Sequence, residues 1–444
     1  MDDPRPWSDR RLHLVGIGGA GMSGYATVAA QLGAAVSGSD RAPGPTLDRL
    51  RAIGIDARAG HDPVNVPAGD DVEVVVSSAI APDNPEVEAA RARGLRVVGR
   101  AVLLGELTGL RRTIAVAGAH GKTTTASMVA HVLLGCGRRP GYLIGGELRT
   151  TGRGADWGDD PWLVVEADES DRSMLSLHVE TAVVTNVELD HHATYGSLGE
   201  LRAAFATLLA SPAHAIVLDR PELLALRGDR EVLAYEADGV ELEPGGSRMR
   251  WRGIDVRLGV PGLHNARNAV AALEAARIAG VAPEAGAAAI ASFAGAGRRF
   301  ERLGTTAGGA LVIDDYAHHP TEVAATIAAA RTLGPRRLVA AFQPHLYSRT
   351  RQLAGAFGRA LAGADLACVL DVYPARERAV DFPDVDGRLV AAAVVDAAPG
   401  REVLWLPGFA EAERVLAGRL RGDDLLLVLG AGNVRELGER LVVR

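Results

Sequence analysis

The segment TIAVAGAHGKTTT, residues 113–125, decides the fold of the chain. Its first five residues predict a strand, the next five predict a loop, and a helix is expected over about 123–134. Backbone N–H groups in such a loop, beside a helix N-terminus, hold phosphate groups. We therefore expect Lys122 to reach the β- and γ-phosphates of a nucleotide, and the Thr123 hydroxyl to bind Mg²⁺.

The spacing of this loop is GxxGKT, two residues shorter than the common pattern GxxxxGKT, which indicates a particular branch rather than a generic NTPase. Lysine and arginine together number 48, and Lys122 is the single lysine, so 47 are arginine. An ammonium is a compact point charge, whereas a guanidinium is a planar fork. We therefore infer that position 122 requires an ammonium group, which arginine cannot replace. The alternative is a glycine turn with an incidental lysine.

The composition limits the class of protein. With 444 residues, the chain is long enough for about three domains of roughly 100–200 residues each. Hydrophobic residues make up 48% and charged residues 23%, which excludes a wholly disordered chain. The net charge of −7 argues against a nucleic-acid binder, and neither a membrane span nor a signal peptide is predicted. Cys136 and Cys368 lie far apart and are interpreted as reduced thiols, so we expect a cytoplasmic protein.

Carboxylates and imidazoles follow two further expected strands. The sequence EADESD, residues 166–171, follows an apolar run, and four carboxylates in six residues suit a divalent cation. The sequence TNVELDHH, residues 185–192, offers an Asp-His-His cluster as another source of ligands. An acidic solvated loop and surface or core histidines are the alternatives for each segment taken alone. The phosphate loop favours the metal interpretation, because phosphate transfer requires Mg²⁺.

A glycine-rich turn, GIGGAG over residues 16–21, follows the first expected strand. It has the GxGxxG spacing of a dinucleotide-binding loop, and Asp40 follows about twenty residues later. Such a loop holds any diphosphate, including that of a nucleotide-sugar, so NAD is not established. An NAD-dependent oxidoreductase is the competing class of enzyme, but it leaves the phosphate loop and the acid cluster unexplained.

Two strand ends in the last third of the chain are rich in polar side chains. They are DDYAHHP, residues 314–320, and QPHLYSRT, residues 343–350. Ligand sites in open α/β sheets lie at the carboxyl ends of strands, and an arginine there binds a carboxylate in a bidentate pair. We expect a polar pocket, with loop capping as the alternative for each segment. Further helices are expected over 199–210, 266–279, 320–333 and 351–362, and a small antiparallel patch over 232–258.

These motifs occur in one order along nearly the whole chain. They are GIGGAGMSG, SSAI with DNPE, AGAHGKTTT, EADESD, VTNVELDH, PGLHNARNAVAA, GRRFE, DDYAHHPTE and FQPHLYSRT. Through this ordered set of motifs, the sequence resembles the Mur ligase family. The resemblance implies an α/β protein of three domains: an N-terminal Rossmann-like UDP-binding sheet over 1–109, a central P-loop ATPase domain over 110–302, and a C-terminal Rossmann-like domain over 303–444 that receives the amino acid.

The resemblance also implies roles for residues at matching positions. ATP is expected on Gly118, His120, Gly121, Lys122, Thr123, Thr124, Asn268, Arg299 and Asp315. Mg²⁺ is expected on Thr123, Glu166 and His191. The UDP-sugar is expected on Gly18, Gly19, Ala20, Gly21, Met22, Asp40, Ser77 and Ser78. The amino acid and the new amide are expected on Tyr316, His318, His345 and Arg349, and catalysis on Lys122, His318, His345 and Arg349.

The reaction implied by the resemblance is that of the alanine-adding branch. ATP drives the joining of L-alanine to the carboxylate of UDP-N-acetylmuramate through an acyl phosphate, with release of ADP, in peptidoglycan precursor synthesis. Either His318 or His345 orients the amine or takes its proton, or positioning alone suffices. A monomer or weak homodimer is expected. The single lysine fits this branch, since several relatives in other branches carry a carbamylated lysine beside Mg²⁺.

One residue departs from the family pattern, because Leu346 stands where the family often has arginine. The carboxylate of the amino acid then depends on Arg349 or Arg351. Two alternatives stay open at this point. One is a cell-wall recycling ligase that attaches a ready-made tripeptide to the same sugar nucleotide. The other is an inactive binding module, which is expected to lack Lys122 or Glu166, whereas this chain has both.

Overall fold

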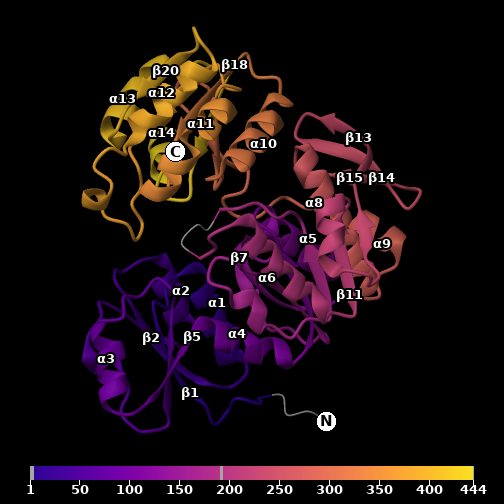
Figure 1. Ribbon diagram of the computed structural model, residues 1–444, viewed down its shortest axis with the longest axis vertical. Coiled ribbons are helices and arrows are strands. Elements are labelled where there is room, and N and C mark those ends of the chain that lie inside the picture. The colour runs from indigo at the N-terminus through magenta and orange to yellow at the C-terminus, as the bar shows by residue number, and fades with distance from the viewer. Residues whose placement is uncertain (1–4, 191–193, 444) are drawn as a thin grey trace. The chain divides into compact units, whose positions relative to one another are not determined.

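The computed structural model describes residues 5–190 and 194–443, and it confirms the expected α/β class (Figure 1). By its internal contacts the chain divides into two units. The first consists of the residues up to 236 together with 268–290, and the second of 237–267 together with the residues from 291 onward. The first unit contains the glycine-rich turn and the phosphate loop, and the second contains the two polar strand ends near the C-terminus.

The N-terminal sheet of the first unit has five parallel strands in the order β3-β2-β1-β4-β5. The strands are β1 (Arg11–Val15), β2 (Ala35–Asp40), β3 (Asp56–Ala59), β4 (Val72–Val76) and β5 (Arg96–Gly99), and the helices are α1 (Ala20–Gln31), α2 (Pro45–Ala52), α3 (Pro85–Ala92) and α4 (Arg100–Gly109). Strands β2 and β3 lie on one side of β1, and β4 and β5 lie on the other, so the direction in which successive strands are added reverses at β1. A ligand site is expected at the carboxyl end of that strand, because the order reverses there.

The second sheet of this unit has seven strands in the order β12-β11-β10-β6-β9-β7-β8. The strands are β6 (Arg112–Ala117), β7 (Gly141–Leu148), β8 (Arg153–Asp156), β9 (Trp162–Ala167), β10 (Thr181–Val184), β11 (His214–Leu218) and β12 (Leu233–Tyr235), and the helices are α5 (Lys122–Gly135), α6 (Leu198–Ala210), α7 (Pro221–Leu224), α8 (Leu263–Ile278) and α9 (Pro283–Ile290). The first five residues of α8, 263–267, belong to the second unit. Only β8 runs antiparallel to its neighbour. The helix α5 is buried along almost its whole length, so the phosphate loop stands on a rigid base.

The second unit contains a small antiparallel sheet and a six-stranded sheet. The small sheet consists of β13 (Asp238–Glu243), β14 (Gly246–Trp251) and β15 (Ile254–Leu258). It confirms the expected antiparallel patch, although the patch begins at Asp238 rather than at residue 232. The residues of β12 lie parallel to β11 instead, because they extend the edge of the seven-stranded sheet.

The six-stranded sheet has the order β16-β17-β21-β18-β19-β20, with only β16 antiparallel. The strands are β16 (Glu301–Thr305), β17 (Leu311–Asp315), β18 (Arg337–Phe342), β19 (Leu366–Val369), β20 (Glu402–Trp405) and β21 (Asp424–Leu429), and the helices are α10 (Pro320–Arg331), α11 (Tyr347–Leu361), α12 (Gly387–Ala397), α13 (Phe409–Arg419) and α14 (Arg435–Leu441). Alternate residues of β21 pack into separate cores on the two faces, with α10, α11 and α12 on one face and α13 and α14 on the other. This burial on both faces explains the continuous apolar run of β21.

The helix expected over 351–362 begins earlier than the sequence indicated, at Tyr347. Leu346 precedes it with a φ of 70°, a left-handed conformation that is uncommon for a residue other than glycine. The backbone N–H of Ser348 donates to Glu377, 2.9 Å away, and this contact supports the first turn from outside the helix. Arg349 therefore lies in the first turn of α11 rather than in a loop.

In the part of the chain that the structure describes, no helix combines the length and the apolar character needed to cross a lipid bilayer.

Candidate active site

The phosphate loop lies between the end of β6 at Ala117 and the start of α5 at Lys122. Two of its residues need to be glycine. Gly118 has a φ of 133°, and a Cβ there would lie 2.1 Å from Thr185 Oγ1. Gly121 has a φ of 83°, and a Cβ there would lie 2.9 Å from Asn268 Oδ1. Glycine thus lets the loop pack closely against Thr185 and Asn268 just before the N-terminus of α5, a position where backbone N–H groups bind phosphate.

The two residues that follow strand β10, Thr185 and Asn186, fix the shape of this loop. The His120 N–H donates to Asn186 Oδ1 at 3.0 Å, and Asn186 Nδ2 donates back to the His120 carbonyl at 2.9 Å. The Thr185 hydroxyl donates to the same carbonyl at 2.6 Å. Asn186 was not among the residues singled out from the sequence, although it lies in the TNVELDHH segment. Its reciprocal bonds leave the loop little freedom to rearrange.

Lys122 is held by an acidic partner that sequence reasoning did not assign. Its Nζ lies 2.8 Å from Glu169 Oε2 and donates to the Gly118 carbonyl at 2.7 Å. Only 15% of the Lys122 side chain and 2% of the Glu169 side chain are exposed. Burial alone would lower the pKa of Lys122, but the charges of Glu169 and Asp168 outweigh burial and raise this pKa above its ordinary range. The ammonium is therefore permanently charged.

The four carboxylates of residues 166–171 do not form one metal cluster, contrary to the simplest interpretation of the sequence. Arg100 binds two of them, since its Nη2 lies 2.8 Å from Asp168 Oδ2 and its Nε lies 2.7 Å from Asp171 Oδ2. Burial alone would raise the pKa of Asp168, but Lys122 and Arg100 hold it well below its usual range. A third carboxylate, that of Glu169, pairs with Lys122. Only Glu166 stands beside the expected metal-binding hydroxyl.

Glu166 and Thr123 form the metal-binding part of the candidate site. The Thr123 hydroxyl donates to Glu166 Oε2 at 3.1 Å, and the Gly145 N–H donates to Glu166 Oε1 at 2.5 Å. A hydroxyl and a carboxylate are the oxygen ligands that Mg²⁺ accepts while it also binds phosphate. These residues therefore fit Mg²⁺ bound with a nucleotide. His191, the third expected ligand, lies outside the described residues.

The glycine-rich turn of the N-terminal sheet is also held by a carboxylate. Gly18 N–H donates to Asp40 Oδ2 at 2.9 Å, and a Cβ at Gly18 would lie within 2.9 Å of the same oxygen. Gly16 has a φ of 85° and lies against the Ser77 side chain. The ends of β1, β2 and β4 thus meet at this turn, which begins α1. Gly19, Ala20 and Ser78 are exposed, whereas Met22 is buried in the core and presents no side chain to a ligand.

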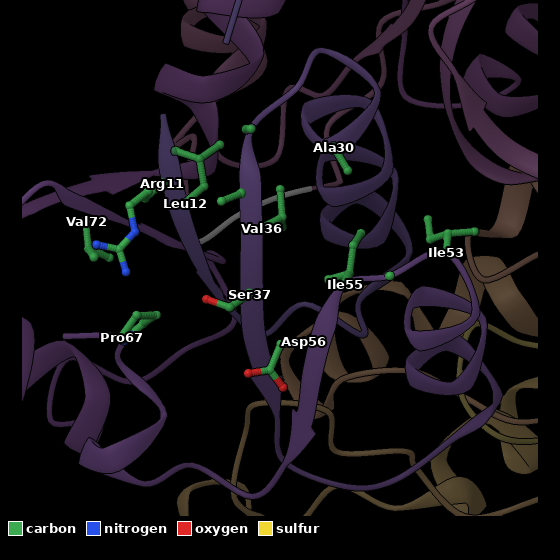
Figure 2. A pocket seen from close by; sticks show the side chains of 13 residues that line it. Arg11, Leu12, Ala30, Val36, Ser37, Ile53, Ile55, Asp56, Pro67 and Val72 are labelled. Atoms are coloured by element: carbon green, nitrogen blue, oxygen red, sulfur yellow. The ribbon is translucent and has the colours of Figure 1, made fainter. Parts of the chain in front are cut away.

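A cavity of about 350 Å³ lies at the amino-terminal ends of the strands of the same sheet, opposite the ends that carry the glycine-rich turn (Figure 2). Its lining includes Leu12, Val36, Asp56 and Val72, which lie at or near the amino ends of β1 to β4. It is therefore separated from the glycine-rich turn by the length of the strands. We do not assign the nucleotide to this cavity.

Asp315 ends β17 in the second unit, and its buried carboxylate organises the turn that follows. Asp315 accepts hydrogen bonds from the N–H groups of Phe300 and Ala317, both at 2.8 Å. Burial raises the pKa of Asp315 to about 6, although Arg299 and these hydrogen bonds oppose the shift. Arg299 Nη1 lies 3.6 Å from Glu322, and its guanidinium lies 5.1 Å from the Tyr316 ring. Arg299 and Asp315, both expected on ATP, thus share one cluster.

The four residues expected to hold the amino acid come together within the second unit. The Tyr316 and His318 ring centroids are 5.3 Å apart, and those of His318 and His345 are 6.0 Å apart, each pair in an edge-to-face arrangement. Arg349 Nη1 lies 3.1 Å from His345 Nδ1. Because arginine only donates hydrogen bonds, this ring nitrogen accepts, and the imidazole is in its neutral form.

Arg349 and Arg351 have different surroundings, which bears on the choice between them. Arg349 is only 4% exposed and lies against His345. Arg351 is exposed, and its guanidinium lies 5.1 Å from the Phe382 ring. Leu346, at the position of the departure from the family pattern, is buried. The cluster therefore contains Arg349 and not Arg351.

Three family models match successive parts of the chain. They are the catalytic domain of the Mur ligase family over residues 11–112, the Mur ligase middle domain over 116–276, and the glutamate ligase domain of Mur ligases over 298–432. The chain belongs to the Mur ligase family. The three-domain architecture expected from the sequence is confirmed, and this Mur ligase is an ATP-dependent, amide-forming enzyme.

Individual relatives cover almost the whole of this Mur ligase. The UDP-N-acetylmuramate–L-alanine ligase of Halorhodospira halophila is 44% identical over 97% of this chain and 93% of its own length. The solved UDP-N-acetylmuramate–alanine ligase of Thermotoga maritima has a TM-score of 0.83 at 27% identity and covers 97% of this chain and 98% of its own. A solved murein peptide ligase from Psychrobacter arcticus has the same coverage but a TM-score of 0.71 at 25% identity. The similarity is thus greater to the alanine ligases than to this peptide ligase.

Proposed function

We propose that this Mur ligase joins L-alanine to the carboxylate of UDP-N-acetylmuramate at the expense of ATP, with Mg²⁺ as cofactor. The observation that carries the proposal is the 3.1 Å hydrogen bond between Thr123 Oγ1 and Glu166 Oε2, beside the buried ammonium of Lys122. A nucleoside triphosphate with its cation needs a cationic group and oxygen ligands for the metal together beside one phosphate loop. The similarity to alanine ligases over nearly the full length supports the choice of substrates.

A carboxylate is a poor acyl donor at neutral pH, so its activation as an acyl phosphate is required before an amine attacks. Lys122 is the group in this chain that neutralises charge on the phosphoryl group during transfer, because it stays protonated at every physiological pH. When bound at Thr123 and Glu166, Mg²⁺ supplies further neutralisation of phosphate charge. The reciprocal hydrogen bonds between Asn186 and His120 keep the loop N–H groups in place, so little reorganisation is needed during the reaction.

The amino acid is assigned to the cluster of Tyr316, His318, His345 and Arg349. Arg349 carries the only charge of this set that complements a carboxylate, so it is assigned the carboxylate of L-alanine. Because His345 Nδ1 already accepts from Arg349, its Nε2 carries the proton, so His345 is suited to orient the amine and not to take a proton from it. His318 Nδ1 donates to the Tyr316 carbonyl at 3.0 Å and lies 3.2 Å from Glu322 Oε2, which fixes its ring; in the neutral imidazole Nε2 is then the acceptor nitrogen.

The remaining assignments stay predictions that accompany this proposal. The UDP group is assigned to the turn at residues 16–21 with Asp40, Ser77 and Ser78. The chain is assigned to the cytoplasm, where ATP is made available, and its expected state is a monomer or weak homodimer. These assignments concern binding, location and assembly, and each is open to direct measurement.

Phosphate release tests the proposed function. The purified enzyme is given ATP, Mg²⁺ and UDP-N-acetylmuramate, with L-alanine, glycine, L-serine or the tripeptide of the recycling reaction as the amine. We expect the highest kcat/KM with L-alanine and no release above background without UDP-N-acetylmuramate. Preference for the tripeptide would instead assign the chain to the recycling reaction. As a control for the loop, Lys122→Ala is expected to remove release with every amine.

A further inference from the structure

Residues 372–377, VYPARE, form a segment that the motifs did not include and the proposed mechanism does not use. The segment follows β19 and lies against the start of α11. Tyr373 N–H donates to the Pro344 carbonyl at 2.8 Å, and the Leu346 N–H donates to the Tyr373 carbonyl at 2.9 Å. His345 and Tyr373 thus form a parallel β-bridge, which fixes the backbone of His345 on one side.

The side chains of the same two residues also pack together. The rings of His345 and Tyr373 are stacked, with centroids 5.7 Å apart and planes 17° apart. Stacking covers one face of the imidazole, while its Nδ1 accepts from Arg349 at 3.1 Å. The Tyr373 ring on its face and the Arg349 guanidinium at Nδ1 thus both restrict the orientation of the imidazole, in addition to the edge-to-face contact with His318.

Gly432 supports Tyr373 from a different loop. A Cβ at Gly432 would lie 2.6 Å from Tyr373 Cγ and 2.5 Å from Gln343 Oε1, so no larger residue fits unless the tyrosine ring moves. This glycine belongs to the loop that follows β21, the central strand of the sheet. The tyrosine ring is thus held in place by the fold on one side and holds His345 on the other.

We propose that Tyr373 is a positioning residue for the amino acid, acting through His345. The proposal rests on the proposed function, because it assigns the amino acid to the cluster of His345 and Arg349. Tyr373 keeps the imidazole turned so that its Nδ1 receives Arg349, and this contact prepares the guanidinium for the carboxylate of the incoming amino acid. The role depends on the aromatic ring of Tyr373 and not on its hydroxyl.

Matched variants separate positioning from folding. Tyr373→Leu removes the ring, and we expect the KM for L-alanine to rise about five- to tenfold, the effect of a lost aromatic pair, with the KM for ATP changed less than twofold. Tyr373→Phe keeps the ring and is expected to restore the wild-type KM. Gly432→Ala, which displaces the ring, is expected to resemble Tyr373→Leu. Gly418→Ala is the control, because a Cβ there meets no other atom within 4 Å.

A second measurement does not depend on turnover. Nitrogen NMR of the histidine side chains reports which ring nitrogen carries the proton, and the His345 signal is assigned by its loss in His345→Gln. We expect one tautomer, protonated at Nε2, in the wild type and in Tyr373→Phe, and a mixture in Tyr373→Leu. An unchanged His345 signal and an unchanged KM for L-alanine in Tyr373→Leu would overturn the positioning role. A wild type that releases no phosphate with any amine would instead refute the proposed function, and the NMR result would still decide whether Tyr373 orients His345.

Discussion

Replacement of Lys122 by arginine keeps the charge of the phosphate loop and changes only its shape. Lys122 Nζ is a single atom that meets the Gly118 carbonyl at 2.7 Å and Glu169 at 2.8 Å. A guanidinium is planar and larger, and Glu169 is too deeply buried to move aside without loss of other contacts. We therefore expect the arginine variant to fold and to bind the sugar nucleotide, but to place its charge away from the transferring phosphoryl group.

The size of the effect follows from the kind of contact that is lost. Removal of one charge-stabilising contact in a transition state costs on the order of 10²–10³ in kcat, or about 3–4 kcal/mol. Phosphate release at saturating substrates measures kcat, and thermal unfolding verifies that the variant is folded. Arg139→Lys is the matched control, since Arg139 pairs with Asp159 on the surface, and it should leave kcat unchanged. Activity of Lys122→Arg within about threefold of the wild type would refute the special role of this lysine.

Three further predictions concern the metal, the amino acid and the N-terminal domain. Glu166→Ala should abolish Mg²⁺-dependent turnover while calorimetry shows UDP-N-acetylmuramate affinity within about twofold of the wild type; a parallel loss of that affinity would contradict the separate assignment of the two ligands. Arg349→Ala should raise the KM for L-alanine about 10- to 100-fold, the equivalent of one charge-assisted hydrogen bond, and should affect alaninamide much less; an equal loss for both amines would show that Arg349 does not contact the carboxylate. In the wild type, burial alone would raise the pKa of Glu86, but hydrogen bonds from His13, Ser39 and Asn65 lower it from 4.5 to about 2. Because this pKa is depressed in the folded state, its stabilising effect is full above pH 4.5 and is lost as the pH falls toward 2. Glu86→Gln should therefore lower the free energy of unfolding at pH 7 by about 1–3 kcal/mol and should weaken its decrease in acid; a variant with the wild-type acid dependence would contradict this account.

The sequence was most informative where local pattern and chemistry coincide. The strand, the short glycine loop and the helix around Lys122 follow from adjacent residues, and the single lysine drew attention to the same position. The buried strands of the C-terminal sheet were equally predictable, because burial on both faces requires a continuous apolar run. These features depend on neighbouring residues, so they require no knowledge of the tertiary structure.

The contacts that complete the site join residues far apart in the chain, and the sequence does not reveal them. Nothing in EADESD indicates that Glu169 pairs with Lys122, or that Asp168 and Asp171 pair with Arg100. The early start of α11 depends on the left-handed backbone of Leu346. A leucine in the sequence does not indicate this conformation. These partners become apparent only when the strands that carry them are placed side by side.

Tyr373 was missed for the same reason, because its contacts are with residues far away in the sequence. It contacts His345 through a bridge between two loops, and its importance depends on Gly432 more than fifty residues later. A glycine that follows a strand is common, so only the 2.6 Å distance from its Cβ position to the tyrosine ring shows what it permits.

The central claim is that ATP activates the carboxylate of the sugar nucleotide before the amine attacks, and oxygen labelling tests it most directly. UDP-N-acetylmuramate with ¹⁸O in both carboxylate oxygens is incubated with the enzyme, ATP, Mg²⁺ and L-alanine, and the products are analysed by mass spectrometry. If the carboxylate is phosphorylated, one ¹⁸O leaves with inorganic phosphate and the other stays in the new amide. Formation of the amide with phosphate that contains no ¹⁸O would contradict the account.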